Sequence, residues 1–328
     1  MSDLVKNAQI YLPGLLLSVL LAGAAYLIGQ YFNWPAMLLA LGSGLCLSFF
    51  TQQDVLTPGL NMASKQVLQV AIALMGFQVV IGDIIHLGLP TALLIAFAIF
   101  STIGFGIMLA RLLGLSTTFG ALTGGATAIC GASAAMALSG TLPDQRNKDQ
   151  QTIITVIGVT ALSSLAMILY PMISIALGLN DMQAGVFFGA SIHNVPQAVG
   201  AGYTISEEAG QIATLTKLIR ISFLLPVILC FMLLFSSIGK QARTGKPIPL
   251  FLVLFFVFVL VNSFVDLPPL LQSSLKDFSK FCLLIAIAAI GMKSDLKSLA
   301  QLGIRPLFLM VGETLWLGVV VLAFLIFL

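Results

Sequence analysis

Residues 89–111, LPTALLIAFAIFSTIGFGIMLAR, carry no charged side chain before Arg111. An α-helix rises 1.5 Å per residue, so about 20 apolar residues cross the roughly 30 Å hydrocarbon core of a bilayer. This run is long enough to do so. It predicts a transmembrane helix.

Similar apolar runs lie on both sides of this one. Hydrophobic residues make up 59% of the 328-residue chain and charged residues only 8%, whereas a soluble domain carries about 25% charged residues. We therefore predict an all-α polytopic membrane protein that forms a single integral membrane domain over residues 1–328, with about eleven transmembrane helices. The expected spans are 11–30, 35–51, 64–82, 89–111, 118–140, 152–178, 183–203, 209–238, 248–265, 279–293 and 304–328.

Turn signals and charges organise these spans. Pro and Gly clusters separate several of them, at Asn33-Trp34-Pro35, Thr57-Pro58-Gly59, Leu142-Pro143-Asp144 and Gly245-Lys246-Pro247. The first apolar run is long enough to span, so we expect it to be retained and not cleaved as a signal peptide. Lys and Arg are more numerous on the loops that would lie inside if the N-terminus is cytoplasmic. We therefore expect an N-terminus in the cytoplasm.

The spans 64–82 and 279–293 resemble each other at one constant offset. Ser64-Lys65 corresponds to Ser279-Lys280, and Ala71-Ile72-Ala73 corresponds to Ala286-Ile287-Ala288. The match continues through Gly76 and Gly291 to the pairs Leu87-Gly88 and Leu302-Gly303. The two spans are the third and the tenth, an odd number of spans apart, so the copies would run in opposite directions. We predict an inverted repeat, which many secondary transporters use for alternating access; chance similarity of two apolar helices is the alternative.

The span 118–140 is expected to be broken. It gathers four glycines, among them Gly120, Gly124 and Gly131, around the hydroxyls of Thr127 and Ser133. Glycine lets the backbone open, and hydroxyls can satisfy freed carbonyls or a ligand. The alternative is close helix packing, since Gly120 and Gly124 have GxxxG spacing.

The span 183–203 is the second expected break. It contains Ser191, His193, Asn194, Pro196 and Gln197 in an otherwise apolar run. Proline removes a backbone donor, and polar groups inside a membrane are costly unless they have a function. Broken helices expose N-terminal amides that attract anions and C-terminal carbonyls that attract cations. A histidine that is hydrogen-bonded to a neighbouring helix is the alternative for His193.

Three charged residues inside the spans are further candidates. Lys217 and Arg220 lie at i, i+3 spacing on one helix face and are predicted to bind an oxyanion; interfacial snorkelling is the alternative. Glu313 is an acid well inside the last span and is a candidate for coupling to an ion, either a proton or a cation. A hydrogen bond between helices would explain Glu313 equally well.

Other classes of function find little support. The net charge of +3 gives no footprint for nucleic acid, and the four cysteines Cys46, Cys130, Cys230 and Cys282 stand apart, without metal-ligand spacing. We expect neither a cofactor nor a metal site. The sequence has no HExxH or GxSxG motif and no paired carboxylates, so an enzyme is not expected.

The candidate residues also carry a resemblance. Thr127-Ala128-Ile129-Cys130-Gly131-Ala132-Ser133, Ser191-Ile192-His193 with Gln197, and Lys217 to Arg220 followed by Pro226 resemble the YeiH-type sulfate exporter family. This family is grouped with cation/proton antiporters and bile-acid symporters. The resemblance implies a panel domain and a core domain with crossed, unwound helices that move by an elevator-like mechanism. The sequence departs from the family at Asn194, where an acid often follows the histidine, and at Pro196, usually a small residue.

The leading hypothesis is a secondary transporter of a small anion, such as sulfate, sulfite or a sulfonate, in a bacterial inner membrane. Its substrate-binding candidates are Thr127, Gly131, Ser133, Ser191, His193, Asn194, Gln197, Lys217 and Arg220. A sodium- or proton-coupled carrier of an organic anion, with Glu313 in the ion path, is the second hypothesis, and a channel is the third. The sequence leaves a homodimer open.

Overall fold

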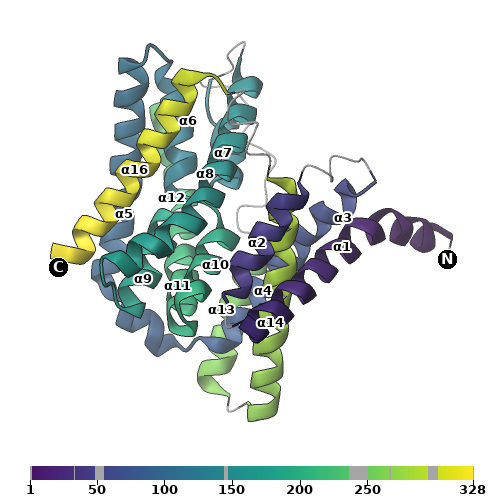
Figure 1. Ribbon diagram of the computed structural model, residues 1–328. Helices are drawn as coiled ribbons and strands as arrows, with labels where there is room; N and C mark the ends of the chain where they lie inside the picture. Colours follow the sequence, from purple (N-terminus) through teal and green to yellow (C-terminus); the bar gives the residue numbers. More distant parts are fainter. Residues whose placement is uncertain are drawn as a thin grey trace. The chain divides into compact units, whose positions relative to one another are not determined.

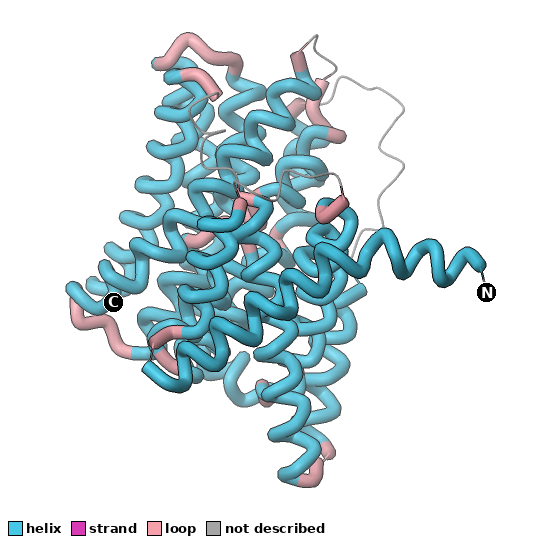
Figure 2. Tube along the Cα trace, turned by 45° about the vertical axis from the view of Figure 1, so that its right-hand side comes forward, coloured by secondary structure: helices cyan, strands magenta, loops and turns pink. Residues whose placement is uncertain are grey.

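The computed structural model describes residues 2–32, 34–48, 55–143, 147–235, 250–265, 267–294 and 302–327. Within these ranges the chain is helical and contains no strand, as Figures 1 and 2 show. The predicted all-α class is thus confirmed. The turn at 245–247, and residues 33 and 144 of two other predicted turns, lie outside the described residues.

Among the described residues, five helices are long and apolar enough to cross a membrane by length and composition: Ile10–Phe32, Leu87–Leu112, Lys148–Ala176, Glu207–Leu234 and Ile304–Phe327. Two shorter apolar helices, Ala36–Leu47 and Val253–Phe264, accompany them. A membrane protein is therefore supported. The count of about eleven crossings stays a prediction.

The chain forms two compact units, each assembled from separate segments. Unit 1 comprises residues 1–86, 203–211 and 248–295, and unit 2 comprises 87–202, 212–247 and 296–328. The elements of unit 1 are α1 (Ser2–Phe32), α2 (Ala36–Leu47), α3 (Thr57–Met62), the π-helical turn η1 (Ala63–Val67), α4 (Leu68–Met75), the 3₁₀ turn η2 (Gly76–Gln78), α13 (Leu250–Phe264) and α14 (Pro269–Lys293).

Unit 2 carries the remaining helices. They are α5 (Ile81–Leu112), α6 (Thr117–Ala128), α7 (Ala132–Ser139), α8 (Lys148–Ala176), α9 (Asp181–Ser191), α10 (Val195–Ile205), α11 (Glu207–Ser222), α12 (Leu224–Leu234) and α16 (Ile304–Phe327). The first residues of α5 and α11 and the last of α10 belong to unit 1. α5 is kinked at Gly88, whose φ of 69° and ψ of 173° are not helical. This glycine therefore separates the first turns of α5 from the apolar run that follows.

Some predicted bounds are wrong. Thr57-Pro58-Gly59 does not form a turn but begins α3, because proline is favoured in the first turn of a helix, where its missing N–H has no carbonyl to bind. The span predicted at 64–82 is divided among η1, α4 and η2 and ends at Gln78. The span predicted at 279–293 begins ten residues earlier, at Pro269, again with proline in the first turn.

The predicted repeat has a counterpart in the contacts of unit 1. Gln78 Nε2 donates a hydrogen bond to Ser279 Oγ at 2.8 Å, and Lys293 Nζ donates one to Ser64 Oγ at 3.1 Å. In the register that pairs Ser64 with Ser279, Gln78 corresponds to Lys293. Exchanging equivalent residues therefore converts one hydrogen bond into the other. Such reciprocity is the property of a two-fold arrangement.

Two equivalent glycines pack against equivalent helices. Gly291 of α14 lies against Leu41 and Gly44 of α2, and Gly76 lies against Phe255 and Phe258 of α13. In the same register residues 36–47 of α2 correspond to residues 251–262, which lie within α13. The structure thus extends the repeat beyond the segment that the sequence singled out.

In unit 2 the repeat continues into α5 and α16. Gly88 and its equivalent Gly303 both have positive φ, 69° and 82°, and each directly precedes a long helix. The rings of Phe105 and Trp316 stack with centroids 4.7 Å apart, and Trp316 Nε1 donates to Ser101 Oγ at 3.4 Å. Arg305, near the start of α16, approaches Gly114, just beyond the end of α5. The two helices therefore run antiparallel, as an inverted repeat requires.

Candidate functional site

The first predicted break lies between α6 and α7. Ser116 caps the start of α6 by accepting a hydrogen bond from Phe119 N at 3.2 Å. The helix ends at Ala128, Ile129 leaves helical geometry, and Gly131 adopts a φ of 66° before α7 begins. Only glycine takes this conformation without steric cost. The break predicted for the span 118–140 is therefore confirmed.

Close packing through small residues is also present in this span. A side chain on Gly120 would collide with the backbone of Gly106 in α5, and one on Gly124 would press against Thr102 and Ile103. The alternative reading of Gly120 and Gly124 is thus correct for these two positions. The packing lies in α6, whereas the break lies at its C-terminal end.

The second predicted break lies between α9 and α10. α9 starts with a capping box in which Asn180 and Gln183 satisfy each other's backbone amides. It ends at Ser191, and α10 resumes at Val195 with Pro196 in its first turn. Proline is compatible with that turn because the amide there has no helical acceptor. Ile192, His193 and Asn194 therefore form the break.

The two breaks meet inside unit 2. A side chain on Gly131 would collide with Asn194 Oδ1 and approach His193 Cβ. The imidazole Nδ1 of His193 lies 3.2 Å from the carbonyl oxygen of Thr127, in the last turn of α6. A carbonyl can only accept, so His193 donates from Nδ1. The polar segments of two separate helices thus contact each other at one place.

Lys217 and Arg220 of α11 join the carbonyl ends of both broken helices. Lys217 Nζ donates to the carbonyls of Ile129 at 3.0 Å and Ile192 at 2.6 Å. Arg220 donates to four carbonyls, those of Thr127, Ala128, Gly189 and Ile192. Within the described part of the chain, no acidic side chain contacts either cation. The two side chains therefore offset the negative ends of the α6 and α9 dipoles.

This placement differs from both sequence-based readings of the pair. Lys217 and Arg220 have 0% and 1% of their surface exposed, so they do not snorkel to an interface. They also direct their donors to carbonyls, whereas the sequence suggested direct contact with an oxyanion. That contact stays a prediction. Their positive charge is buried at the crossing, the place where the α6/α7 break and the α9/α10 break meet. It contributes to the electrostatic potential there.

Glu313 of α16 is buried beside the first break. Thr123 Oγ1 lies 2.7 Å from Glu313 Oε1, and Thr127 Oγ1 lies 3.3 Å from Oε2. Gly106 of α5 packs directly against the carboxyl group, with no space for a side chain. Glu313 does make the hydrogen bonds between helices that the sequence allowed for. Coupling to an ion remains a separate hypothesis.

His193 has a second partner on α16. Its Nε2 lies 3.0 Å from Thr314 Oγ1, and this hydroxyl also lies 2.7 Å from the carbonyl oxygen of Met310. Thr314 can donate to the imidazole or to the carbonyl, but it has only one hydrogen. His193 therefore links Thr314 of α16 to the Thr127 carbonyl at the end of α6, and the neighbouring Glu313 of α16 contacts the Thr127 hydroxyl.

The remaining predicted residues differ in accessibility. Ser133 is exposed at the start of α7, and Asn194 is partly exposed. Ser191 turns its hydroxyl back to the Phe187 carbonyl of its own helix. Gln197 is 1% exposed, and its Oε1 has no hydrogen-bond partner. The predicted residues thus form one cluster with different roles, and Ser133 and Asn194 are its open side.

Ser163, Ser164 and Thr314 also belong to this cluster, although the sequence-based prediction did not include them. Ser163 of α8 accepts a hydrogen bond from Asn194 N at 3.0 Å, and Ser164 lies 3.5 Å from Gln197 Nε2. Thr123 and Thr314 hold the two titratable side chains. The signal available for the serines was a pair of hydroxyls in the middle of an apolar span, where polar groups are costly.

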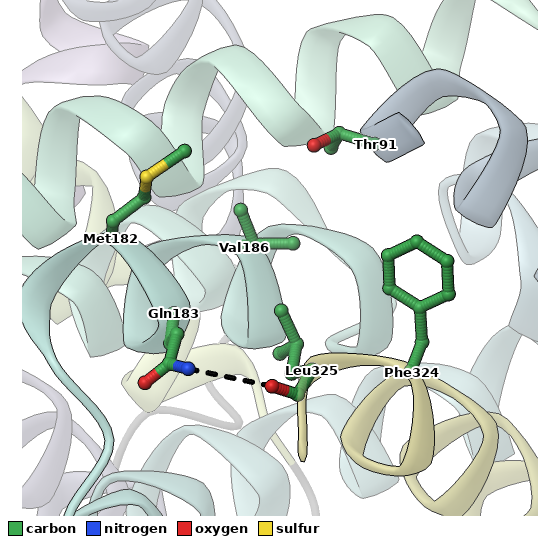
Figure 3. Close-up of a pocket in the computed structure, with 6 residues that line it drawn as sticks. All are labelled: Thr91, Met182, Gln183, Val186, Phe324 and Leu325. Atoms are coloured by element: carbon green, nitrogen blue, oxygen red, sulfur yellow. Dashed lines mark hydrogen bonds between the residues drawn. The ribbon is translucent and has the colours of Figure 1, made fainter. Parts of the chain in front are cut away.

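A cavity of about 160 Å³ lies elsewhere in unit 2. Figure 3 shows its lining, in which Gln183 Nε2 donates to the Leu325 carbonyl at 3.4 Å. The lining residues are Thr91, Met182, Gln183, Val186, Phe324 and Leu325. None of them belongs to the crossing. A search of the described ranges for three or more His, Cys, Asp or Glu side chains able to hold a metal finds no such group.

Comparison with known proteins gives consistent relatives. Residues 13–310 match the family described as "Conserved hypothetical protein 698". A UPF0324 membrane protein of Chlorobaculum tepidum is 40% identical over 95% of this chain and 88% of its own length. The UPF0324 membrane protein TauZ of Paracoccus denitrificans is 41% identical over 94% and 93%. A UPF0324 membrane protein of Rhizobium meliloti is 42% identical over 95% and 92%. No solved structure matches the chain.

Proposed function

Since the chain belongs to the UPF0324 membrane protein family, we propose that it is a secondary transporter of a small anion. The anion binds where the breaks of α6/α7 and α9/α10 meet. Sulfate, sulfite and sulfonates are the proposed substrates, by resemblance to the sulfate exporters. The sulfate label and the place among antiporters and symporters are part of this proposal.

The observation that carries the proposal is that cationic side chains bind the carbonyl ends of two helices at the crossing, while the amide ends of two other helices lie beside them. The C-terminal ends of α6 and α9 receive the donors of Lys217 and Arg220. The N-terminal ends of α7 and α10 lie at the same breaks, and the first amides of a helix have no acceptor within that helix. Such ends bind anions readily. Two buried cations add to their positive potential.

The direct contacts to the anion are assigned to the accessible side of the cluster. Ser133 is exposed in the first turn of α7, and Asn194 lies against Gly131 just before α10. Gln197 has an unsatisfied amide oxygen, and its amide group offers donors when it is rotated. Lys217, Arg220 and His193 hold the ends of the broken helices in place. This division of roles refines the set of residues that the sequence proposed.

Transport would follow alternating access, in which unit 2 carries the site and moves as an elevator. The reciprocal contacts of the repeat support this proposal, since inverted repeats provide two related conformations from one architecture. We place the protein in a bacterial inner membrane with its N-terminus in the cytoplasm. The proposal is for a carrier without enzymatic activity.

Flux into proteoliposomes tests the function. Purified protein should exchange labelled sulfate or a sulfonate with saturation and counterflow, because a carrier binds its substrate on alternate sides. The double variant Ser133→Ala/Asn194→Ala should reduce the flux at least tenfold, and Ser273→Ala, an exposed hydroxyl of α14, should retain it. Full flux in the double variant would contradict the assigned site. Flux without counterflow would favour a channel.

A second candidate is a sodium-coupled carrier of an organic anion, favoured by the buried carboxyl of Glu313 and its two threonine hydroxyls. Carboxylate and hydroxyl oxygens are ligands that hard cations accept. Uptake would then require sodium and would be lost in Glu313→Gln. Uptake of equal rate without sodium would eliminate this candidate.

A further inference from the structure

The buried charges of the crossing do not match a dianion unless Glu313 carries a proton. Among the described residues of unit 2, the buried Lys, Arg, Asp and Glu side chains are Lys217, Arg220 and Glu313, with His193 as a further titratable group. We assign a positive charge to both Lys217 and Arg220. The partial charges of the two C-terminal and two N-terminal helix ends offset each other. Two cations and one carboxylate leave a single positive charge. A protonated Glu313 leaves two.

Glu313 is connected to the crossing through one residue. Thr127 Oγ1 contacts the Glu313 carboxyl, and the carbonyl oxygen of the same threonine accepts from His193 Nδ1 and from Arg220. Thr127 lies in the last turn of α6, next to the break. A change of charge on Glu313 is therefore transmitted through Thr127 alone to His193 and Arg220.

Thr123 can satisfy Glu313 in both protonation states. Its hydroxyl lies 2.7 Å from Glu313 Oε1, but also 3.1 Å from the Phe119 carbonyl and 3.3 Å from the Gly120 carbonyl. The hydroxyl donates to the carboxylate when Glu313 is ionised. When Glu313 is protonated, the hydroxyl turns to a carbonyl of α6 and accepts from the acid. Both states are fully hydrogen-bonded without movement of the backbone.

A proton at this position requires less rearrangement than the sodium ion of the second candidate function. A sodium ion would require Thr123 and Thr127 to direct their oxygen lone pairs toward it together with the carboxylate, which breaks both hydroxyl–carboxylate bonds. Gly106 already packs directly against Glu313 Oε1. A proton needs neither the space nor the rearrangement.

Three other titratable side chains lie around Glu313, those of His193, Tyr170 and Cys130. His193 has a similar alternative partner, because Thr314 Oγ1 lies near both Nε2 and the Met310 carbonyl. A proton on His193, however, would add a third cation beside Lys217 and Arg220 and leave the Glu313 charge in place. Tyr170 reaches the Thr314 carbonyl at 3.5 Å, and Cys130 contacts Ser133; in their neutral forms neither changes the balance. Charge balance therefore selects Glu313.

We propose that Glu313 takes up one proton when a small dianion binds at the crossing, and that Thr123 accommodates both states of the acid. The inference rests on the proposed function, because it assumes an anion at the breaks. A dianion such as sulfate is then carried together with a proton, whereas a singly charged sulfonate matches the site with Glu313 ionised. Proton and dianion promote each other's binding to the same extent, as linkage requires.

Calorimetric titration of the purified full-length protein tests this. Sodium sulfate and sodium methanesulfonate are compared at constant sodium and ionic strength, in two buffers of different ionisation enthalpy. Sulfate should bind with uptake of close to one proton. Its affinity should rise by up to about tenfold for each decrease of one pH unit, over the pH range in which the linked group titrates. Methanesulfonate should bind without proton uptake.

Variants locate the proton. Glu313→Gln should bind sulfate without proton uptake and with an affinity independent of pH, whereas His193→Gln should retain the uptake. Thr123→Ser keeps the hydroxyl and the uptake, and Thr123→Val diminishes the uptake. Thr155→Val removes a buried hydroxyl that bonds within α8 and should behave as the wild type.

The possible results distinguish failure of the proton uptake by Glu313 from failure of the proposed anion transport. Sulfate binding to the wild type without proton uptake overturns this inference and leaves the proposed function standing. Undiminished uptake in Glu313→Gln also overturns it. Failure of both anions to bind overturns the proposed function itself, and the inference with it. If Glu313→Gln does not fold, the difference in proton uptake between Thr123→Ser and Thr123→Val tests the location of the proton, and equal uptake in these two variants overturns the inference.

Discussion

Four main-chain carbonyls accept hydrogen bonds from the single side chain of Arg220. They belong to Thr127, Ala128, Gly189 and Ile192 and lie at the ends of two different helices. The planar guanidinium carries five N–H donors in a fixed arrangement and can serve several acceptors at once. Lys217, one turn earlier, serves two carbonyls. The donors of these two side chains thus explain how two broken helix ends are tolerated in a buried site.

Removing these donors should destabilise the protein unequally. A buried carbonyl without a partner costs about 1–3 kcal/mol. Arg220→Met removes the donor to the Ala128 and Gly189 carbonyls and should lower the free energy of unfolding by about 2–6 kcal/mol. Lys217→Met removes the donor to the Ile129 carbonyl and should lower it by about 2 kcal/mol. Arg220→Lys should fall between Arg220→Met and wild type, because it keeps the charge but not the fork. Melting temperatures in one detergent measure the order.

Arg305→Met is the matched control for Arg220→Met, since Arg305 is exposed at the start of α16. It should melt with the wild type. Equal melting of Arg220→Met and Arg305→Met would show that the carbonyls find other partners.

At the scale of elements, the approach of α6 and α16 to α5 depends on a glycine. A side chain on Gly106 would overlap the Gly120 carbonyl and the Glu313 carboxyl, whereas one on Gly104, two residues earlier in α5, would meet nothing within 4 Å. Both glycines lie in one helix, so intrinsic helix propensity acts on them equally. The difference between them reports only on packing.

Alanine at these positions should therefore have opposite effects. Gly104→Ala should raise the free energy of unfolding by about 0.5–1 kcal/mol, because alanine is the better helix former. Gly106→Ala should lower it by about 1–3 kcal/mol through overpacking. Thermal melting of the two variants and wild type measures both signs, and a Gly106→Ala variant as stable as Gly104→Ala would refute the close approach.

At the scale of the whole molecule, the repeat organises both units. Reciprocal hydrogen bonds link η1 and η2 to α14 in unit 1, and α5 and α16 run antiparallel in unit 2. The end of α5 and the start of α16 consequently lie at one side of unit 2. Lys and Arg at both places, including Arg111 and Arg305, favour the cytoplasmic side.

Cysteine labelling tests this topology. In a variant without the four native cysteines, Arg111→Cys and Arg305→Cys should be protected from an impermeant maleimide in intact cells and become labelled after lysis. Leu89→Cys, at the other end of the same helix, should be labelled from outside. Labelling of Arg111→Cys and Arg305→Cys from opposite sides would contradict the antiparallel arrangement, and inverse labelling of all three would reverse the orientation.

The amino-acid sequence by itself determined the helical membrane class, the location of both breaks and the register of the repeat. Each follows from residues close together in the chain: the length of an apolar run, glycines around a helix end, or a proline in a first turn. The partners of Lys217, Arg220 and Glu313 were decided only by the tertiary structure. Their hydrogen bonds join residues up to 190 positions apart, and a cation in an apolar helix can be satisfied equally by a ligand, by lipid headgroups or by carbonyls. Which of these it contacts depends on where the other helices end.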